Sequence, residues 1–227
     1  MGRAVLPWTP TYLELAQEQF GIARQHHPNC KVWLAQQGLY AGEARQLLDW
    51  LDSERPQWVE AVVYRPFSEG MTFPDPLEEE DGLSLERYSR SGPLSAPVNR
   101  LRAAVPGQYQ VILYPDETHT FRSQYPAVGM DAAVQHVWGR EDGPSPRPRE
   151  MATIHAATSP ASDGAIPHSE GNTDDLNKFI SSALCWNPFL SAEEIVHQYA
   201  RWFFGPLCAQ EAAELALKLE EALSGPL

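Results

Sequence analysis

Short apolar runs alternate with helix-like segments along this chain, and this order constrains the fold more than any other feature. The apolar runs cover residues 31–36, 58–64, 109–114 and 163–168, and the second of them is rich in β-branched and aromatic residues. Segments with apolar residues at helical spacing lie between them, at 41–54, 96–104 and 147–157. Strands that alternate with helices form parallel sheets with helical crossovers, and such strands are nearly continuous in apolar residues. We therefore expect an α/β fold.

Local signals support several of these helices. In residues 41–54 one apolar face is formed by Ala44, Leu47, Leu48 and Leu51. Ser191 and Glu194 have the spacing of a capping box, in which each side chain binds a backbone N–H of the other residue. An apolar stripe follows this cap, and we expect its aromatic end, Trp202–Phe204, to be core rather than a platform for sugars. A last helix is expected at 209–223.

The number of strands leaves two architectures open. A (β/α)8 barrel has eight strands and typically about 250 residues, whereas this chain has 227 residues and four strand-like runs. The sheet is therefore either open or half of a barrel. We expect a partial (β/α) barrel domain at residues 1–186 and a C-terminal helical extension, packed on the barrel, at residues 187–227.

The charge of the chain excludes two classes of partner. Its 30 acidic and 17 basic residues give a net charge of −13, which argues against nucleic acid and against an anionic membrane surface. It contains no apolar run of the roughly twenty residues that a membrane span needs. Cys30, Cys185 and Cys208 are odd in number and widely spaced, so we expect reduced thiols and a cytoplasmic protein.

Acidic residues follow two of the predicted strands at the point where each strand ends. Asp116 and Glu117 follow the third run, and Glu170 follows the fourth. Parallel strands end at one edge of a sheet, where α/β enzymes keep their chemistry. Carboxyls there can reach the roughly 5–9 Å separation used in glycoside hydrolysis, with one of them protonated in a drier environment. The alternative is that Asp116 caps a turn and Glu170 caps a helix.

Other polar side chains lie close to these acids in the sequence. The candidate substrate-binding residues are Tyr114, His119, Arg122, Tyr125, His168 and Asn172. Histidine and arginine can bind sugar hydroxyls or a uronate carboxylate, arginine through two parallel bonds. The alternatives are that the loop residues brace a long loop, that His168 packs, and that Asn172, Asp174, Asp175 and Asn177 begin a helix.

Several other chemistries lack their sequence signals. The chain has no phosphate-binding glycine loop, no nucleophile elbow and no histidine, cysteine and acid spacing typical of a metal site. We therefore expect neither a metal nor a cofactor.

Three segments carry a resemblance to a known group of proteins. Tyr114–Pro126, Ser169–Lys178 and Ser182–Pro188 resemble bacterial glycoside-hydrolase-like proteins with a TIM-type barrel, and the resemblance extends from about Lys31 onward. The segment at 184–195 is similar to the one that follows the barrel in bacterial α-glucuronidases, although Phe189 stands where those enzymes usually have an aspartate.

The resemblance implies the second half of a (β/α)8 barrel and a carbohydrate or glycoside as substrate. In α-glucuronidases the general acid comes from an earlier strand, for which this sequence has no matching position. We therefore expect a glycoside hydrolase-like protein that hydrolyses weakly or not at all as an isolated, N-terminally truncated half barrel.

A non-catalytic function is the alternative. The chain would then be a remnant that binds carbohydrate, associates with itself, or pairs with a complementing N-terminal barrel half, because exposed sheet edges promote pairing.

Overall fold

The computed structural model describes residues 8–36, 39, 41–64, 96–118, 146–169 and 174–223. Its strands form a four-stranded parallel sheet in the order β1-β2-β3-β4. They are β1 (Val32–Ala35), β2 (Val59–Tyr64), β3 (Gln110–Leu113) and β4 (Gly164–Ala165). The predicted α/β fold with a parallel sheet is thus confirmed. The sheet does not close on itself within the described residues.

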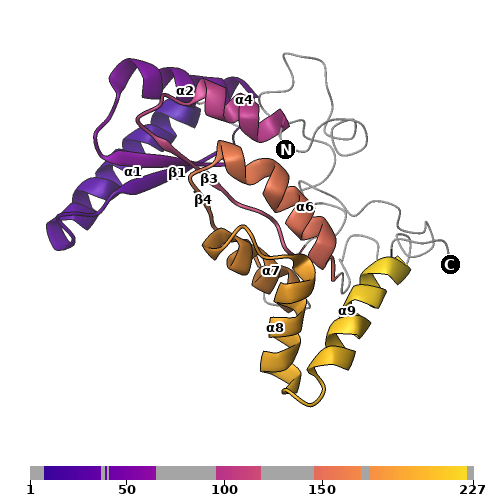
Figure 1. The fold of residues 1–227 in the computed structure, drawn as a ribbon. Coiled ribbons are helices and arrows are strands. Elements are labelled where there is room, and N and C mark those ends of the chain that lie inside the picture. The colour runs from indigo at the N-terminus through magenta and orange to yellow at the C-terminus, as the bar shows by residue number, and fades with distance from the viewer. Residues whose placement is uncertain are drawn as a thin grey trace, which may run out of the picture.

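Helices precede the first strand, connect the strands and follow the last one (Figure 1). They are α1 (Trp8–His26), α2 (Ala41–Glu54), α4 (Ala96–Ala104), α6 (Pro148–Thr158), α7 (Asp175–Trp186), α8 (Ala192–Phe204) and α9 (Ala209–Leu223), with a 3-10 turn η1 (Ser159–Ala161). Within the described ranges, no helix is both long enough and apolar enough to cross a membrane.

The two faces of the sheet have different surroundings. Because side chains alternate along a strand, Val62, Val111 and Leu113 lie on one face, in a core shared with residues of α1, α2 and α4. Val63 and Ile112 lie on the other face, in a small separate cluster with alanines and Tyr114. The sheet therefore has one helix-covered face and one face of smaller apolar side chains.

Proline explains why β4 is shorter than predicted. The sequence suggests a strand at 163–168, but the regular ladder covers Gly164–Ala165. Ile166 N still donates to Leu113 O at 2.8 Å, but Pro115 in the neighbouring segment has no N–H group to continue the ladder. Pairing resumes once, as a parallel bridge between Asp116 and His168.

The C-terminal helices form a second core. Side chains from α6, α7, α8 and α9 share this cluster, including Ile180, Leu184, Ile195 and Val196. Both α8 and α9 are thus packed against neighbouring helices, as Figure 1 also shows. The predicted boundary between residues 186 and 187 lies inside this group of helices, and it stays a prediction.

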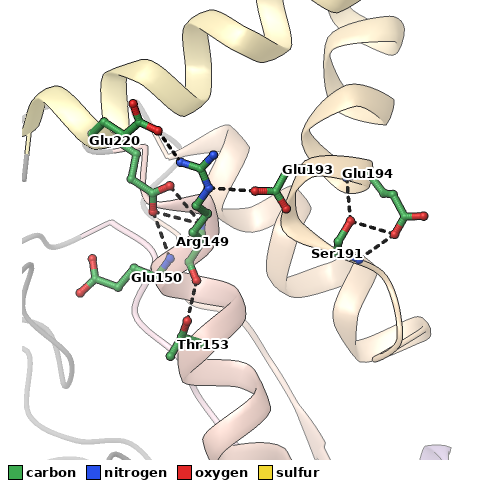
Figure 2. Close-up of polar contacts among 8 residues, drawn as sticks. Arg149, Glu150, Thr153, Ser191, Glu193, Glu194 and Glu220 are labelled. Atoms are coloured by element: carbon green, nitrogen blue, oxygen red, sulfur yellow. Dashed lines mark hydrogen bonds and ion pairs between the residues drawn. The ribbon is translucent and has the colours of Figure 1, made fainter.

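The cap of α8 is confirmed, whereas its aromatic end differs from expectation. Ser191 Oγ accepts a hydrogen bond from Glu194 N at 3.2 Å, and Ser191 N donates to Glu194 Oε2 at 2.8 Å (Figure 2). Trp202, however, is 81 % exposed, and Phe203 and Phe204 are more than half exposed. Helical periodicity gives the direction of these side chains but not how far neighbouring helices extend along α8.

Glu220 of α9 caps α6 from a distance (Figure 2). The first N–H groups of a helix lack partners within it, and the N-cap residue Arg147 gives α6 no side-chain cap. Instead, Arg149 N donates to both oxygens of Glu220, at 3.0 and 3.2 Å, and Glu150 N donates to Oε1 at 3.0 Å. A carboxylate here also meets the positive end of the helix dipole. This contact fixes α9 to α6.

We expect Glu220→Ala to lower the free energy of unfolding by about 1–2 kcal/mol, because two partly buried N–H groups lose their acceptor. Urea unfolding followed by circular dichroism measures the change. The control is Glu221→Ala, which removes only a surface ion pair with Arg149 and should cost at most about 0.5 kcal/mol. Equal effects of the two substitutions would show that Glu220 does not act as a cap.

Candidate functional site

The chain stays paired beyond the ends of β3 and β4. His168 N donates to Pro115 O at 2.7 Å, and Glu117 N donates to His168 O at 3.0 Å. Together with the bridge between Asp116 and His168, these bonds hold two sequence-distant segments side by side at the carboxyl edge of the sheet. Four of the residues singled out from the sequence, Tyr114, Asp116, Glu117 and His168, therefore lie in one place.

Tyr114 and His168 form a pair at this edge. The Tyr114 hydroxyl lies 2.9 Å from His168 Nδ1, and the two ring centroids are 5.3 Å apart. Tyr114 packs on the apolar cluster of the sheet face opposite the helices α1, α2 and α4. Because β3 side chains alternate, Asp116 is placed on the same face as Tyr114. A carboxylate is thus placed on the same face as the paired phenol and imidazole.

Asp116 also shapes its own turn. The side chain is buried, and its Oδ1 accepts a hydrogen bond from Thr118 N at 3.1 Å. This bond is typical of an Asx turn, in which an aspartate binds the backbone two residues further on. The turn-capping alternative for Asp116 is therefore observed, and it coexists with the placement of Asp116 beside His168.

Glu117 has a different environment, because its side chain points toward α7 and contacts this helix. It is 2 % exposed, and its Oε1 accepts a hydrogen bond from Ser181 Oγ at 2.5 Å. Asn177 Nδ2 of the same helix approaches the backbone oxygen of Glu117 at 3.4 Å. Oε2 of Glu117 is buried and has no hydrogen-bond partner among the described residues. Glu117 is thus enclosed between the strand end and α7.

Burial raises the pKa of Glu117 to about 8. Desolvation is the main cause, since a buried carboxyl loses the hydration of its charged form. The Ser181 hydrogen bond and the Arg147 charge lower this pKa, whereas the charges of Asp116 and Asp174 raise it. Glu117 is therefore a neutral carboxylic acid at pH 7.

Asp174 connects the beginning of α7 to the strand end. It occupies the N-cap position, but its side chain makes no capping bond. Instead its Oδ2 accepts from Thr118 Oγ1 at 2.5 Å, and its Oδ1 lies 3.6 Å from Lys178 Nζ. Asp174 thus stands at the start of the helix as expected, but its carboxylate binds the hydroxyl of Thr118, which follows β3, and not a backbone N–H of α7. Asp175 lies in the first turn of α7 and pairs with Lys178 at 3.2 Å.

Arg147 and Asn177 complete the surroundings of Glu117. Arg147 is buried, its backbone N donates to Asn177 Oδ1 at 2.9 Å, and its Nη1 lies 3.3 Å from Glu150 Oε2. Sequence reasoning missed the roles of Arg147 and Ser181, and it assigned Asn177 to a helix start. No local signal could have indicated them, because the contacts join residues 30 to 64 positions apart.

The remaining candidates lie outside the described residues, and their roles stay predictions. They are Glu170, His119, Arg122, Tyr125 and Asn172. Within the part of the chain that the structure describes, no group of three or more histidine, cysteine, aspartate and glutamate side chains could hold a metal ion.

Comparisons with known proteins found no matching protein-family model, no matching curated protein and no matching solved structure.

Proposed function

We propose that this chain is a glycoside hydrolase-like protein whose carboxyl-edge site binds a glycan or glycoside. The observation that carries the proposal is the bridge between Asp116 and His168, which places an acid, an imidazole and the Tyr114 hydroxyl on one face. The carboxyl edge of a parallel sheet is where α/β enzymes place their reacting groups. The sequential strand order, with helices against one face, also supports a half barrel.

The two described acids have different roles in this proposal. Glu117 is 2 % exposed and hydrogen-bonded to α7, so it joins this helix to the strand end and does not touch a substrate. Of these two acids, Asp116 is the one that acts on the substrate, as the acid or base that glycoside hydrolysis requires. Glu170 remains the proposed second carboxylate, and no metal or cofactor takes part.

A binding function is the second candidate. The sheet ends at β1 on one side and at β4 on the other within the described residues, and exposed edges favour pairing with another chain. In this alternative the chain binds carbohydrate without cleaving it, and it associates with a second copy or with a complementing barrel half. A cytoplasmic location belongs to both candidates.

A panel of nitrophenyl glycosides and free sugars tests the proposal. We expect at least one ligand to be bound or hydrolysed, and Asp116→Asn to reduce that activity by about a hundredfold for hydrolysis or tenfold for binding. Hydrolysis rates and calorimetric titrations are the measurements. The control is Asp175→Asn, which changes an exposed carboxylate on α7 and should leave both unchanged.

The outcomes separate the candidates. Hydrolysis that is abolished by Asp116→Asn supports the enzyme hypothesis. The equivalent change of acid to amide, Glu170→Gln, then tests the second carboxylate. Binding without turnover supports the carbohydrate-binding alternative. Neither binding nor turnover across the panel, or identical behaviour of Asp116→Asn and wild type, overturns the proposed site.

A further inference from the structure

A single buried side chain joins the end of β3 to α7. Glu117 binds Ser181 of α7 through its carboxyl, and its backbone oxygen lies within reach of the Asn177 amide of the same helix. Its backbone N–H donates to His168 O, in the segment that follows β4. We propose that Glu117 and Ser181 form a proton-operated latch that holds α7 against the carboxyl edge of the sheet. The latch is independent of the proposed glycoside chemistry.

The two oxygens of Glu117 have different surroundings. Oε1 lies 2.5 Å from Ser181 Oγ, a hydrogen bond that the neutral acid and the carboxylate can both make, because a hydroxyl donates as well as accepts. Oε2 is buried and has no hydrogen-bond partner among the described residues. A neutral oxygen tolerates such a site far better than an ionised one, because an unpaired buried charge loses its hydration.

The charges around Glu117 disfavour its ionised form. Asp116 of its own segment and Asp174 at the start of α7 both act on it with negative charge. Arg147, which precedes α6, is the opposing positive charge, and it is already paired with Glu150. Asp174 in turn has Lys178 at 3.6 Å.

One further titratable group faces this position from α7. The thiol of Cys185 lies one turn beyond Ser181, and its pKa is raised by burial and by the charge of Glu117. A thiol is either neutral or, as a thiolate, negative, so Cys185 cannot offset the charge of an ionised Glu117. The site therefore holds more negative than positive charge before Glu117 loses its proton.

Loss of the proton to solvent opens the latch. The carboxylate is stabilised when water reaches it, and α7 is the element whose movement admits water, because Ser181 of that helix is hydrogen-bonded to the Glu117 carboxyl. The same movement strains the bond between Thr118 and Asp174. The order of α7, and through it the carboxyl edge of the sheet, thus depends on the protonation of Glu117.

Hydrogen exchange of α7 at several pH values tests the latch in the full-length chain. After correction for the intrinsic exchange rate, we expect protection of residues 175–186 to fall at least tenfold between pH 6.5 and 9, relative to α2 as an internal reference. Glu117→Gln, which keeps the neutral shape, should retain its α7 protection at pH 9. An α7 protection that does not change with pH in wild type, or that falls equally in Glu117→Gln, overturns the proposal.

A second variant keeps the test decisive if Glu117→Gln does not fold. Ser181→Ala removes the hydroxyl that favours the ionised carboxyl. The pH at which α7 loses protection should therefore move upward in this variant. A downward movement, or none, contradicts the latch. Ser182→Ala, in the next position of the same helix, is the matched control and should leave the midpoint where it is in wild type.

Discussion

Replacing Leu47 with alanine is expected to lower the free energy of unfolding by about 2–5 kcal/mol. Leu47 lies in α2, is 0 % exposed, and belongs to the core between the helices and the sheet. Its truncation removes apolar contacts and leaves a cavity that close-packed neighbours fill only in part. The loss is a large fraction of the stability of a typical domain.

Chemical denaturation at neutral pH measures this change, and a leucine in α1 provides the matched control. Leu15 is 52 % exposed, so Leu15→Ala makes the same chemical change without opening a cavity, and it should cost at most about 0.5 kcal/mol. Similar losses in the two variants would show that the face formed by Ala44, Leu47, Leu48 and Leu51 is not the buried one.

The second large effect is a loss of stability as the pH rises, and Glu117 causes it. Its pKa is about 8 in the folded protein, against 4.5 for an ordinary glutamate. Between these values the folded state holds a proton that the unfolded state has released, so the unfolded state binds fewer protons. The free energy of unfolding then falls with increasing pH, by about 1.4 kcal/mol per pH unit for one proton. The contribution is fully present below pH 4.5 and is lost as pH passes through about 8.

Urea unfolding of wild type and Glu117→Gln at pH values from 5 to 9 measures this contribution. The difference between the two curves separates Glu117 and its electrostatic neighbours from the titrating groups that do not interact with it, which act equally in both proteins. His155 is one of them: burial lowers its pKa, so its own effect is a loss of stability at acidic pH. We expect the free energy of unfolding of the variant to rise relative to that of wild type up to about pH 8, and the difference to stay constant at higher pH. Parallel curves would contradict the raised pKa.

Local patterns predicted many of the elements correctly because their causes lie within a few residues. The capping box of Ser191 and Glu194 needs only the first turn of its own helix, and it forms as expected. The apolar face of α2 is buried as its periodicity indicates. The last helix begins and ends where the sequence suggested, at Ala209–Leu223. The alternation of strands and helices also sufficed for a parallel sheet, since connected parallel strands need crossovers.

The surroundings of each side chain were less predictable than the elements. Trp202 and Phe203 have the spacing of a buried face, yet they are exposed, since burial depends on where other helices end. Asp174 has the position of a helix cap, yet its carboxylate binds Thr118, in the segment that follows β3. In both cases the deciding atoms lie far away in the sequence.

The sequence alone determined the order of strands and helices, the helix cap at Ser191 and the presence of acids at a strand end, because periodicity and local hydrogen bonding depend on neighbouring residues. Only the tertiary structure decided what each acid does. Asp116 and Glu117 are adjacent, but strand alternation and the packing of α7 place one beside His168 and enclose the other against Ser181. Burial then raises the pKa of Glu117, and Ser181, which helps to enclose it, is 64 positions away in the sequence.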